Sequence, residues 1–506
     1  IDTGKNDQFL RFWFEVSEEC RSMRDEKRKW FDYVKGGEFR KWYGNIELTV
    51  NWLNDGSDVR AHPSSTIRNP KYFLKPAVTW SLTGNKGFGA RIIPKNCMFD
   101  NNGSSVFPRS DQLGALSCFL NSKVANHCLE VLNPTVAYQV GDIARLPYAV
   151  DIETGKLSEQ FLELGKSDWD AYETSWDFTT LPLLQPDNRA ETLEATYTNL
   201  RAHWQGMTDD MQRLEEENNR IFIDAYGLQD ELTPEVPLNE ITLTCNPAYR
   251  YGIKNDAAAN ESRLRADTMA EFLSYAVGCM FGRYSLDTPG LILANQGETL
   301  ADHLARVPEP SFMPDEDNVI PVLDADWFAD DITERFRLFL RVTFGEEAFQ
   351  ENLAFVEEAL GKDIRKYFTR DFYADHVKRY KKRPIYWMFS SRSGSFNALI
   401  YMHRYQPDTV SVILNDYLRD FRSKLQAHFR EQEAVEVSGE ASAGEKTKAL
   451  KEKDRVNKIL RELDSYERDV LFPLAEAKLT IDLDDGVKVN YPKFGTALAP
   501  IKGLSD

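Results

Sequence analysis

Alternating apolar and polar positions mark residues 69–107, which the sequence predicts to form paired strands. β-branched and aromatic residues cluster at 77–80, 87–94 and 97–99, and Thr-Gly-Asn and Asn-Asn-Gly turns separate these runs. A further strand is predicted at 45–52. We expect this ribbon to hold short polar and cationic side chains beside aromatic supports on an exposed surface: Thr79, Ser81, Thr83, Arg91 and Lys95.

Apolar residues at three- and four-residue spacing predict helices over most of the remaining chain. These helices are expected at 7–33, 111–132, within 154–230, and at 261–283, 327–342, 347–360, 364–372, 397–405, 409–429 and 446–471, with the last two long helices pairing as an antiparallel hairpin. Strand-like runs occur at 241–245, 384–390 and 481–491. The predicted fold class is α+β: a β-rich domain with a leading helix at 1–150, a helical spacer at 151–237, and a mainly helical domain at 238–506.

The net charge of −18 is distributed unevenly along the 506 residues. Residues 1–150 contain 20 Lys and Arg against 16 Asp and Glu, residues 151–360 contain 15 against 42, and residues 361–506 contain 27 against 22. Phosphate binding depends on Lys and Arg, so a DNA-binding face would come from the two ends of the chain. The acidic middle would face solvent or a protein partner.

Two basic segments with interleaved aromatic residues are candidates for phosphate binding. Residues 33–45, YVKGGEFRKWYGN, are equally compatible with a surface loop anchored by aromatic residues. Residues 362–383 hold nine basic and three acidic residues and end in KRYKKR, and a solvated loop ahead of a core strand is the alternative there. The candidate DNA-binding residues are Lys35, Arg40, Lys41, Tyr43, Lys75, Thr79, Ser81, Arg91, Lys95, Lys378, Arg379, Lys381 and Lys382.

Several other classes of protein are disfavoured by the sequence. The six cysteines form no C-x-x-C pair and are expected to be buried small hydrophobic residues, and the dispersed histidines suggest no metal site. No apolar stretch is long enough to cross a membrane and no signal peptide is evident, so a cytoplasmic location without membrane contact is expected. The run Glu215, Glu216 and Glu217 is predicted to be a solvated face.

Several longer motifs carry a family resemblance. The segments KWFDYVKGGEFRKWYGN, KPAVTWS, FGARIIPKNCMFD and LGALSCFLNSKVANHCLEVLNPTVAYQVGDIARLPY are similar to the target-recognition region of single-chain adenine-specific DNA methyltransferases related to type IIG restriction enzymes. The segments KKRPIYWMFSSRSGSFNALIYMHRYQPDTVSVILNDYLRDFRSKL and DDGVKVNYPKFGTALAPI resemble the PglX family, the methyltransferases of BREX phage-defence systems. The resemblance implies a double-stranded DNA partner, and S-adenosylmethionine as the methyl donor of the full-length protein.

The catalytic motifs of that family are not present in proper form. Residues 246–249, Asn-Pro-Ala-Tyr, differ by one residue from the N-P-P-Y loop that holds a flipped adenine, and the second proline is replaced by Ala248. Residues 84–89, GNKGFG, lie between predicted recognition strands and not between a buried parallel strand and a helix. We therefore expect no catalytic residue, cofactor or metal site in this chain, and interpret it as the C-terminal portion of a larger enzyme whose methyltransferase domain precedes it.

Two functional hypotheses follow. The first is that the chain supplies sequence-specific DNA recognition to an adenine N6-methyltransferase. The second is that the acidic middle and the helical C-terminus form a docking scaffold for other BREX proteins, because residues 151–360 would repel DNA. The two hypotheses are compatible with each other.

Overall fold

The computed structural model describes residues 1–21, 28–84, 87–149, 152–254 and 256–504. The chain divides into two compact units, Ile1–Asp267 and Thr268–Asp506, and the boundary falls within helix α10 (Ala257–Met280). Helices and three small sheets make up the described secondary structure, so the predicted α+β class is confirmed. The predicted domain boundaries at residues 150 and 237 stay a prediction.

Two sheets form the β part of the first unit. The four-stranded sheet has the order β1 (Leu10–Phe12), β3 (Leu48–Asn51), β2 (Trp30–Val34), β6 (Met98–Phe99), and only the β2–β6 pairing is parallel. The three-stranded antiparallel sheet has the order β5 (Ala90–Ile93), β4 (Ala77–Trp80), β7 (Ser105–Val106). The predicted strands at 45–52, 77–80, 87–94 and 97–99 are thus present.

The leading helix predicted at 7–33 is wrong for the described residues of that range. The segment contains the short helices α1 (Asn6–Phe9) and α2 (Glu18–Arg21), and strands β1 and β2. Its apolar residues pair across the sheet, with Leu10 opposite Val50 and Phe31 opposite the same valine from the other side. Pairing with β3 therefore overrides the local helical spacing.

The first unit also contains the helices α3 (Leu53–Ala61), α4 (Leu113–Leu120), α5 (Lys123–Leu132), α6 (Val140–Ile143), α7 (Gly155–Asp170), α8 (Leu193–Tyr226) and α9 (Pro247–Tyr251). The single helix predicted at 111–132 is split between α4 and α5. At the break, the Asn121 side chain donates to the carbonyl of Ala90 at 3.0 Å and accepts from its amide at 2.9 Å, while Ser122 caps α5. The break therefore fastens the helices to β5.

The second unit is built around a three-stranded antiparallel sheet with the order β8 (Ile320–Pro321), β10 (Asn397–Tyr401), β9 (Tyr386–Ser390). Its helices are α11 (Leu300–Arg306), α12 (Ile332–Phe344), α13 (Phe349–Leu360), α14 (Ile364–Arg370), α15 (Phe372–Arg379), α16 (Thr409–Val412), α17 (Arg419–Val437), α18 (Ala443–Tyr466), α19 (Phe472–Ala477) and α20 (Val487–Asn490). The helix predicted at 397–405 is wrong, because β10 is the buried central strand. The strand predicted at 481–491 is also wrong: Asp482 caps a short 3-10 turn that leads into α20.

His376 of α15 fastens this helix to the sheet. Its ring is 1% exposed, and Nε2 accepts hydrogen bonds from the amides of Ile385 at 3.2 Å and Tyr386 at 3.0 Å. Burial, with Arg379 and Arg283 nearby, lowers the pKa of His376 well below its usual range. The imidazole is therefore neutral and acts as an acceptor at the start of β9.

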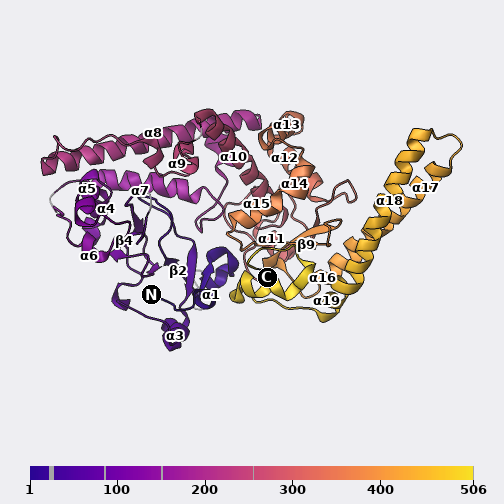
Figure 1. Ribbon diagram of the computed structural model, residues 1–506, viewed down its shortest axis with the longest axis horizontal. Coiled ribbons are helices and arrows are strands. Elements are labelled where there is room, and N and C mark those ends of the chain that lie inside the picture. The colour runs from indigo at the N-terminus through magenta and orange to yellow at the C-terminus, as the bar shows by residue number, and fades with distance from the viewer. Residues whose placement is uncertain (22–27, 85–86, 150–151, 255, 505–506) are drawn as a thin grey trace. The chain divides into compact units, whose positions relative to one another are not determined.

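Helices α17 and α18 form the predicted antiparallel hairpin, which extends away from the rest of the second unit (Figure 1). Three of the buried residues of α18 recur every seven positions, Ala449, Val456 and Leu463, and Tyr466 near its end is also buried. Arg422 of α17 binds Glu467 and contacts Asp464 at 3.0 Å, so charged pairs flank the apolar seam. No helix among the described residues is long and apolar enough to cross a membrane.

Candidate nucleic-acid interface

Arg40, one of the predicted phosphate ligands, is buried in an internal network. Its guanidinium pairs with Asp168 of α7 at 2.5 Å, donates to Thr244 Oγ1 at 2.8 Å, and lies 4.9 Å from the centre of the Trp169 ring. Asp168 also accepts from the amides of Thr244 at 2.7 Å and Cys245 at 2.9 Å. These contacts attach the 33–45 loop to α7 and to residues 241–245. Residues 241–245 do not form a strand, so that prediction is wrong.

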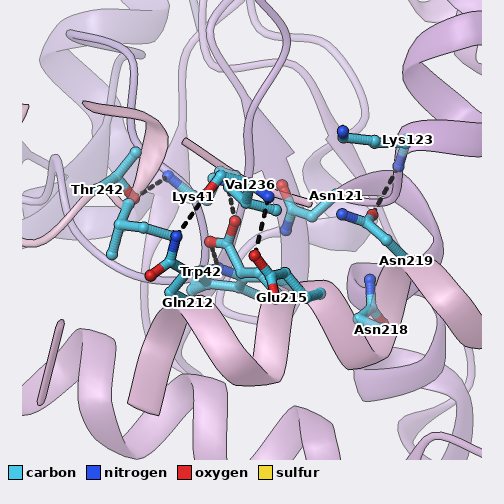
Figure 2. A network of polar contacts seen from close by, with 12 residues as sticks. Lys41, Trp42, Asn121, Lys123, Gln212, Glu215, Asn218, Asn219, Val236 and Thr242 are labelled. Atoms are coloured by element: carbon cyan, nitrogen blue, oxygen red, sulfur yellow. Dashed lines mark hydrogen bonds and ion pairs between the residues drawn. The ribbon is translucent and has the colours of Figure 1, made fainter. Parts of the chain in front are cut away.

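Lys41 and Trp42 are held by Glu215 of α8 (Figure 2). The ammonium of Lys41 pairs with one carboxylate oxygen, and Trp42 Nε1 donates to the other at 2.7 Å. The side chains of Lys41 and Glu215 are only 7% and 4% exposed. The prediction that Glu215 belongs to a solvated face is therefore wrong, and burial raises its pKa against the opposing effect of Lys41.

Further polar side chains of α8 continue this internal network. Asn219 accepts from the amide of Lys123 at 2.9 Å (Figure 2). Asn218 donates to the carbonyl of Cys118 at 3.0 Å. Gln212 donates to the carbonyl of Val236 at 2.7 Å. Polar side chains on one face of α8 thus hydrogen-bond to α4, α5 and the 33–45 loop. The acidic sequence pattern did not indicate this buried polar face.

The ribbon β4–β5 is buried, so the expected exposure of Thr79 and Arg91 is wrong. Thr79 is fully buried and donates to the carbonyl of Ser104 at 2.9 Å. Arg91 is 1% exposed and donates to the carbonyl of Arg40 at 3.3 Å and to Ser81 Oγ at 3.4 Å. Burial, together with Arg40, lowers the pKa of Arg91 to about 10. Tyr43 is also buried, with Lys166 Nζ 5.4 Å from its ring.

The same ribbon has exposed lysines at one end. Leu74 donates to the carbonyl of Cys97 at 3.1 Å, and Asn96 donates to the carbonyl of Leu74 at 3.2 Å. These two hydrogen bonds hold residues 96 and 97 beside Leu74, and the neighbouring Lys75 and Lys95 are both exposed. Lys71 is also exposed and lies 5.1 Å from the Tyr72 ring, which Lys75 approaches to 5.6 Å. We call Lys71, Lys75 and Lys95 the ribbon-end lysines; Lys35 is half-buried on the preceding loop.

The basic segment of the second unit is more accessible. Lys378, Lys381 and Lys382 are exposed at the end of α15 and line a pocket of about 690 Å³. Arg370, which belongs to the basic segment 362–383, lines the same pocket, as does Lys502, which the sequence did not single out. Arg379 instead faces Glu271 at 3.9 Å. We call Lys378, Lys381 and Lys382 the α15 lysines.

The motif at 246–249 has a structural role in the described chain. Asn246 Oδ1 accepts from the amide of Ala248 at 3.0 Å and caps α9, while Nδ2 donates to the carbonyls of Leu238 at 2.7 Å and Ile241 at 2.9 Å. In an N-P-P-Y loop the Asn side chain accepts a hydrogen bond from the target amine, whereas the Asn246 side chain caps α9 and binds neighbouring carbonyls. The described residues also contain no cluster of three or more His, Cys, Asp or Glu arranged to hold a metal ion.

No protein-family model matches the chain. The adenine-specific methyltransferase BrxX of Escherichia coli O9:H4 (strain HS) is 37% identical over 526 aligned residues, which cover 100% of this chain and 43% of that protein. The adenine-specific methyltransferase PglX of Lacticaseibacillus casei (strain Zhang) is 37% identical over 528 residues, covering 97% of this chain and 41% of that protein. The chain thus spans less than half the length of these relatives. Over its whole length it is related to part of the BrxX and PglX adenine-specific methyltransferases, which confirms the family resemblance found in its motifs.

Proposed function

We propose that this chain is the DNA-recognition part of an adenine-specific DNA methyltransferase of a BREX phage-defence system. The observation that carries the proposal is the similarity of the entire chain to two adenine-specific methyltransferases. In the proposed role, the chain binds double-stranded DNA at a specific sequence, and the full-length protein transfers a methyl group to N6 of an adenine there.

The exposed lysines are the proposed phosphate contacts. The ribbon-end lysines and the α15 lysines have side chains that reach solvent, as a phosphate ligand must. Arg40, Lys41 and Arg91 support binding indirectly, because their buried hydrogen bonds fix the loop and ribbon that position the ribbon-end lysines. Phosphate contacts orient a protein on the duplex, while base contacts supply specificity.

S-adenosylmethionine is the methyl donor expected in the full-length protein. We propose no catalytic residue and no donor-binding residue in this chain, since Asn246 uses its side-chain amide to cap α9 and bind neighbouring carbonyls. The proposed contribution of this chain is to bind and orient the duplex so that its adenine can reach the methyl-transfer site.

Fluorescence anisotropy with a labelled duplex, measured over a range of salt concentrations, tests the DNA-binding role. Each phosphate contact adds about 0.9 to the slope of log affinity against log salt. We expect Lys71→Ala, Lys75→Ala and Lys95→Ala together to reduce the slope by about 1 to 3, and the same triple change of the α15 lysines to do likewise.

The matched control is a triple alanine variant of three exposed lysines of the α18 helix: Lys448, Lys451 and Lys458. This control should leave the slope unchanged. Equal affinity and equal slopes for all three variants and the unaltered protein would contradict the proposal.

A second candidate function is docking of other BREX proteins. The hairpin α17–α18 favours it, because Val437 is 76% exposed and Leu450 47% exposed at its outer part. The protein should retain other BREX components in a pull-down from cells carrying the defence system, and Val437→Asp with Leu450→Asp should release them. Recovery of DNA alone would refute docking without affecting the DNA-binding proposal.

A further inference from the structure

The pocket beside the α15 lysines has an apolar floor. Its floor is formed by Phe368, Tyr373, Val377, Met388 and Ile501, and its volume is about 690 Å³. Pockets of roughly 300–1,000 Å³ hold small organic ligands in proteins. This pocket is therefore large enough for a ligand the size of a nucleotide.

Hydrogen bonds hold the walls of this pocket together. The amide of Met388 on β9 donates to the Tyr373 hydroxyl at 3.4 Å, and the amide of Ala499 donates to the carbonyl of Met388 at 2.8 Å. Leu498 also forms an antiparallel bridge with Phe389. The C-terminal segment is thus attached to the edge of β9, and it supplies Pro500, Ile501 and Lys502 to the pocket wall.

The rim of the pocket is cationic. Arg370, Lys502 and the α15 lysines line it, and none of the described residues in the lining is Asp or Glu. The acidic residues of the adjoining helices have other partners: Asp371 pairs with Lys362 at 2.7 Å, and Asp375 accepts from Tyr367 at 2.8 Å. The pocket therefore favours a ligand with several negative charges.

Two lysines at the rim have a strained, left-handed backbone conformation. Lys381 and Lys382 follow α15 with φ values of 51° and 60°, a conformation that glycine adopts without cost. The amide of Lys382 donates to the carbonyl of Val377 at 2.8 Å, and the amide of Arg383 donates to that of Tyr380 at 2.7 Å, which maintains the turn. Backbone strain of this kind concentrates at ligand sites, and here both strained residues line the pocket.

We propose that this pocket binds a nucleoside phosphate, with the base on the apolar floor and the phosphates between the lysines of the rim. An aromatic and aliphatic floor suits a planar base, and lysine ammonium groups bind phosphate oxygens as point charges. The ligand is either a free nucleotide or a nucleotide of a DNA strand. The proposal does not depend on the DNA-recognition role, because a free nucleotide satisfies the same chemistry.

Titration of the purified protein with MANT-ATP and MANT-dAMP, followed by fluorescence, tests this proposal. We expect saturable binding that Lys381→Gly with Lys382→Gly weakens at least ten-fold. This double change removes two cations, and glycine adopts the positive φ of both positions without strain, so we expect the turn to keep its conformation. Ala374→Glu, at an exposed position that lines the pocket, should also weaken binding, whereas Lys448→Ala with Lys451→Ala should have no effect.

Competition experiments separate the sources of the ligand. Displacement of the probe by a short single-stranded oligonucleotide identifies a DNA nucleotide, and displacement by ATP without displacement by the oligonucleotide identifies a free nucleotide; both results support the proposal. Inorganic triphosphate that competes as strongly as ATP would overturn it, because the apolar floor would then contribute nothing. Absence of probe binding would also overturn it, and duplex binding in the same sample would show whether the DNA-recognition role fails as well.

Discussion

Removing the buried carboxylate of Glu215 should open the first unit locally. In the variant Glu215→Ala, the Lys41 ammonium remains buried without its partner, and Trp42 Nε1 loses an acceptor that lies at 2.7 Å. An uncompensated buried charge costs about 3–5 kcal/mol. An exposed ion pair costs far less to break, about 0.2–1 kcal/mol.

The same helix provides the control for this change. Glu217 lies 3.7 Å from Arg213, and these side chains are 47% and 59% exposed. Glu217→Ala should therefore change the free energy of opening by less than about 0.5 kcal/mol. A further variant, Lys41→Met with Glu215→Leu, should recover part of the loss because neither buried charge remains.

Hydrogen exchange measured by mass spectrometry reports this opening directly. The amide of Trp42 donates to the carbonyl of Ala90 at 2.8 Å, and the amide of Ile92 donates to the carbonyl of Trp42 at 2.8 Å. A loss of 3–5 kcal/mol corresponds to an acceleration of exchange at these amides by about 150- to 5,000-fold. Equal exchange rates at the Trp42 and Ile92 amides in Glu215→Ala and Glu217→Ala would refute the claim that buried Glu215 stabilises this loop.

Three further predictions concern stability. Because the pKa of His376 is lowered in the folded protein, only the unfolded state binds a proton at this residue below about pH 6.5, and the free energy of unfolding falls as the pH falls. Between pH 7.5 and 5.5, urea titration should show that His376→Gln loses about 1.4 kcal/mol less stability than the unaltered protein. Equal losses would contradict this. Asn246→Ala should lower the free energy of unfolding by about 1 kcal/mol, because the cap of α9 is lost, whereas the full-length protein with this change should keep its methylation rate. If the folded variant lost its methylation rate, Asn246 would have a catalytic or binding role. In the hairpin, Leu463→Ala should cost about 2–5 kcal/mol in thermal unfolding and the exposed Leu450→Ala under about 0.5 kcal/mol, and equal costs would contradict the seam.

The local pattern was sufficient for many elements of the fold. Turn residues flanking β-branched runs located β4 and β5, and sustained apolar spacing located α12, α13 and the hairpin. It failed for β10, where Ala398 to Tyr401 form an unbroken apolar run. An unbroken apolar run shows no hydrophobic period, so the sequence pattern cannot distinguish a buried strand from a helix here. The segment is a strand because it pairs with β9 after a short turn.

The roles of the cationic residues could not be predicted from local sequence. Arg40 and Lys41 lie in a loop rich in basic and aromatic residues, but their carboxylate partners are Asp168 and Glu215, which are 128 and 174 residues away along the chain. Residue type alone does not distinguish a lysine that binds phosphate from one that neutralises a distant buried carboxylate. Lys502 was missed for the complementary reason, since folding brings it from the C-terminal segment to the pocket that the α15 lysines line.

Lysine acetylation with and without a duplex that carries the recognised site, quantified residue by residue by mass spectrometry, tests the central claim most directly. We expect DNA to protect the ribbon-end lysines and the α15 lysines, whereas Lys448, Lys451 and Lys458 of the hairpin should react equally in both samples. Unchanged reactivity of Lys75, Lys95, Lys378, Lys381 and Lys382 in the DNA-bound protein would contradict the claim that this chain holds the duplex.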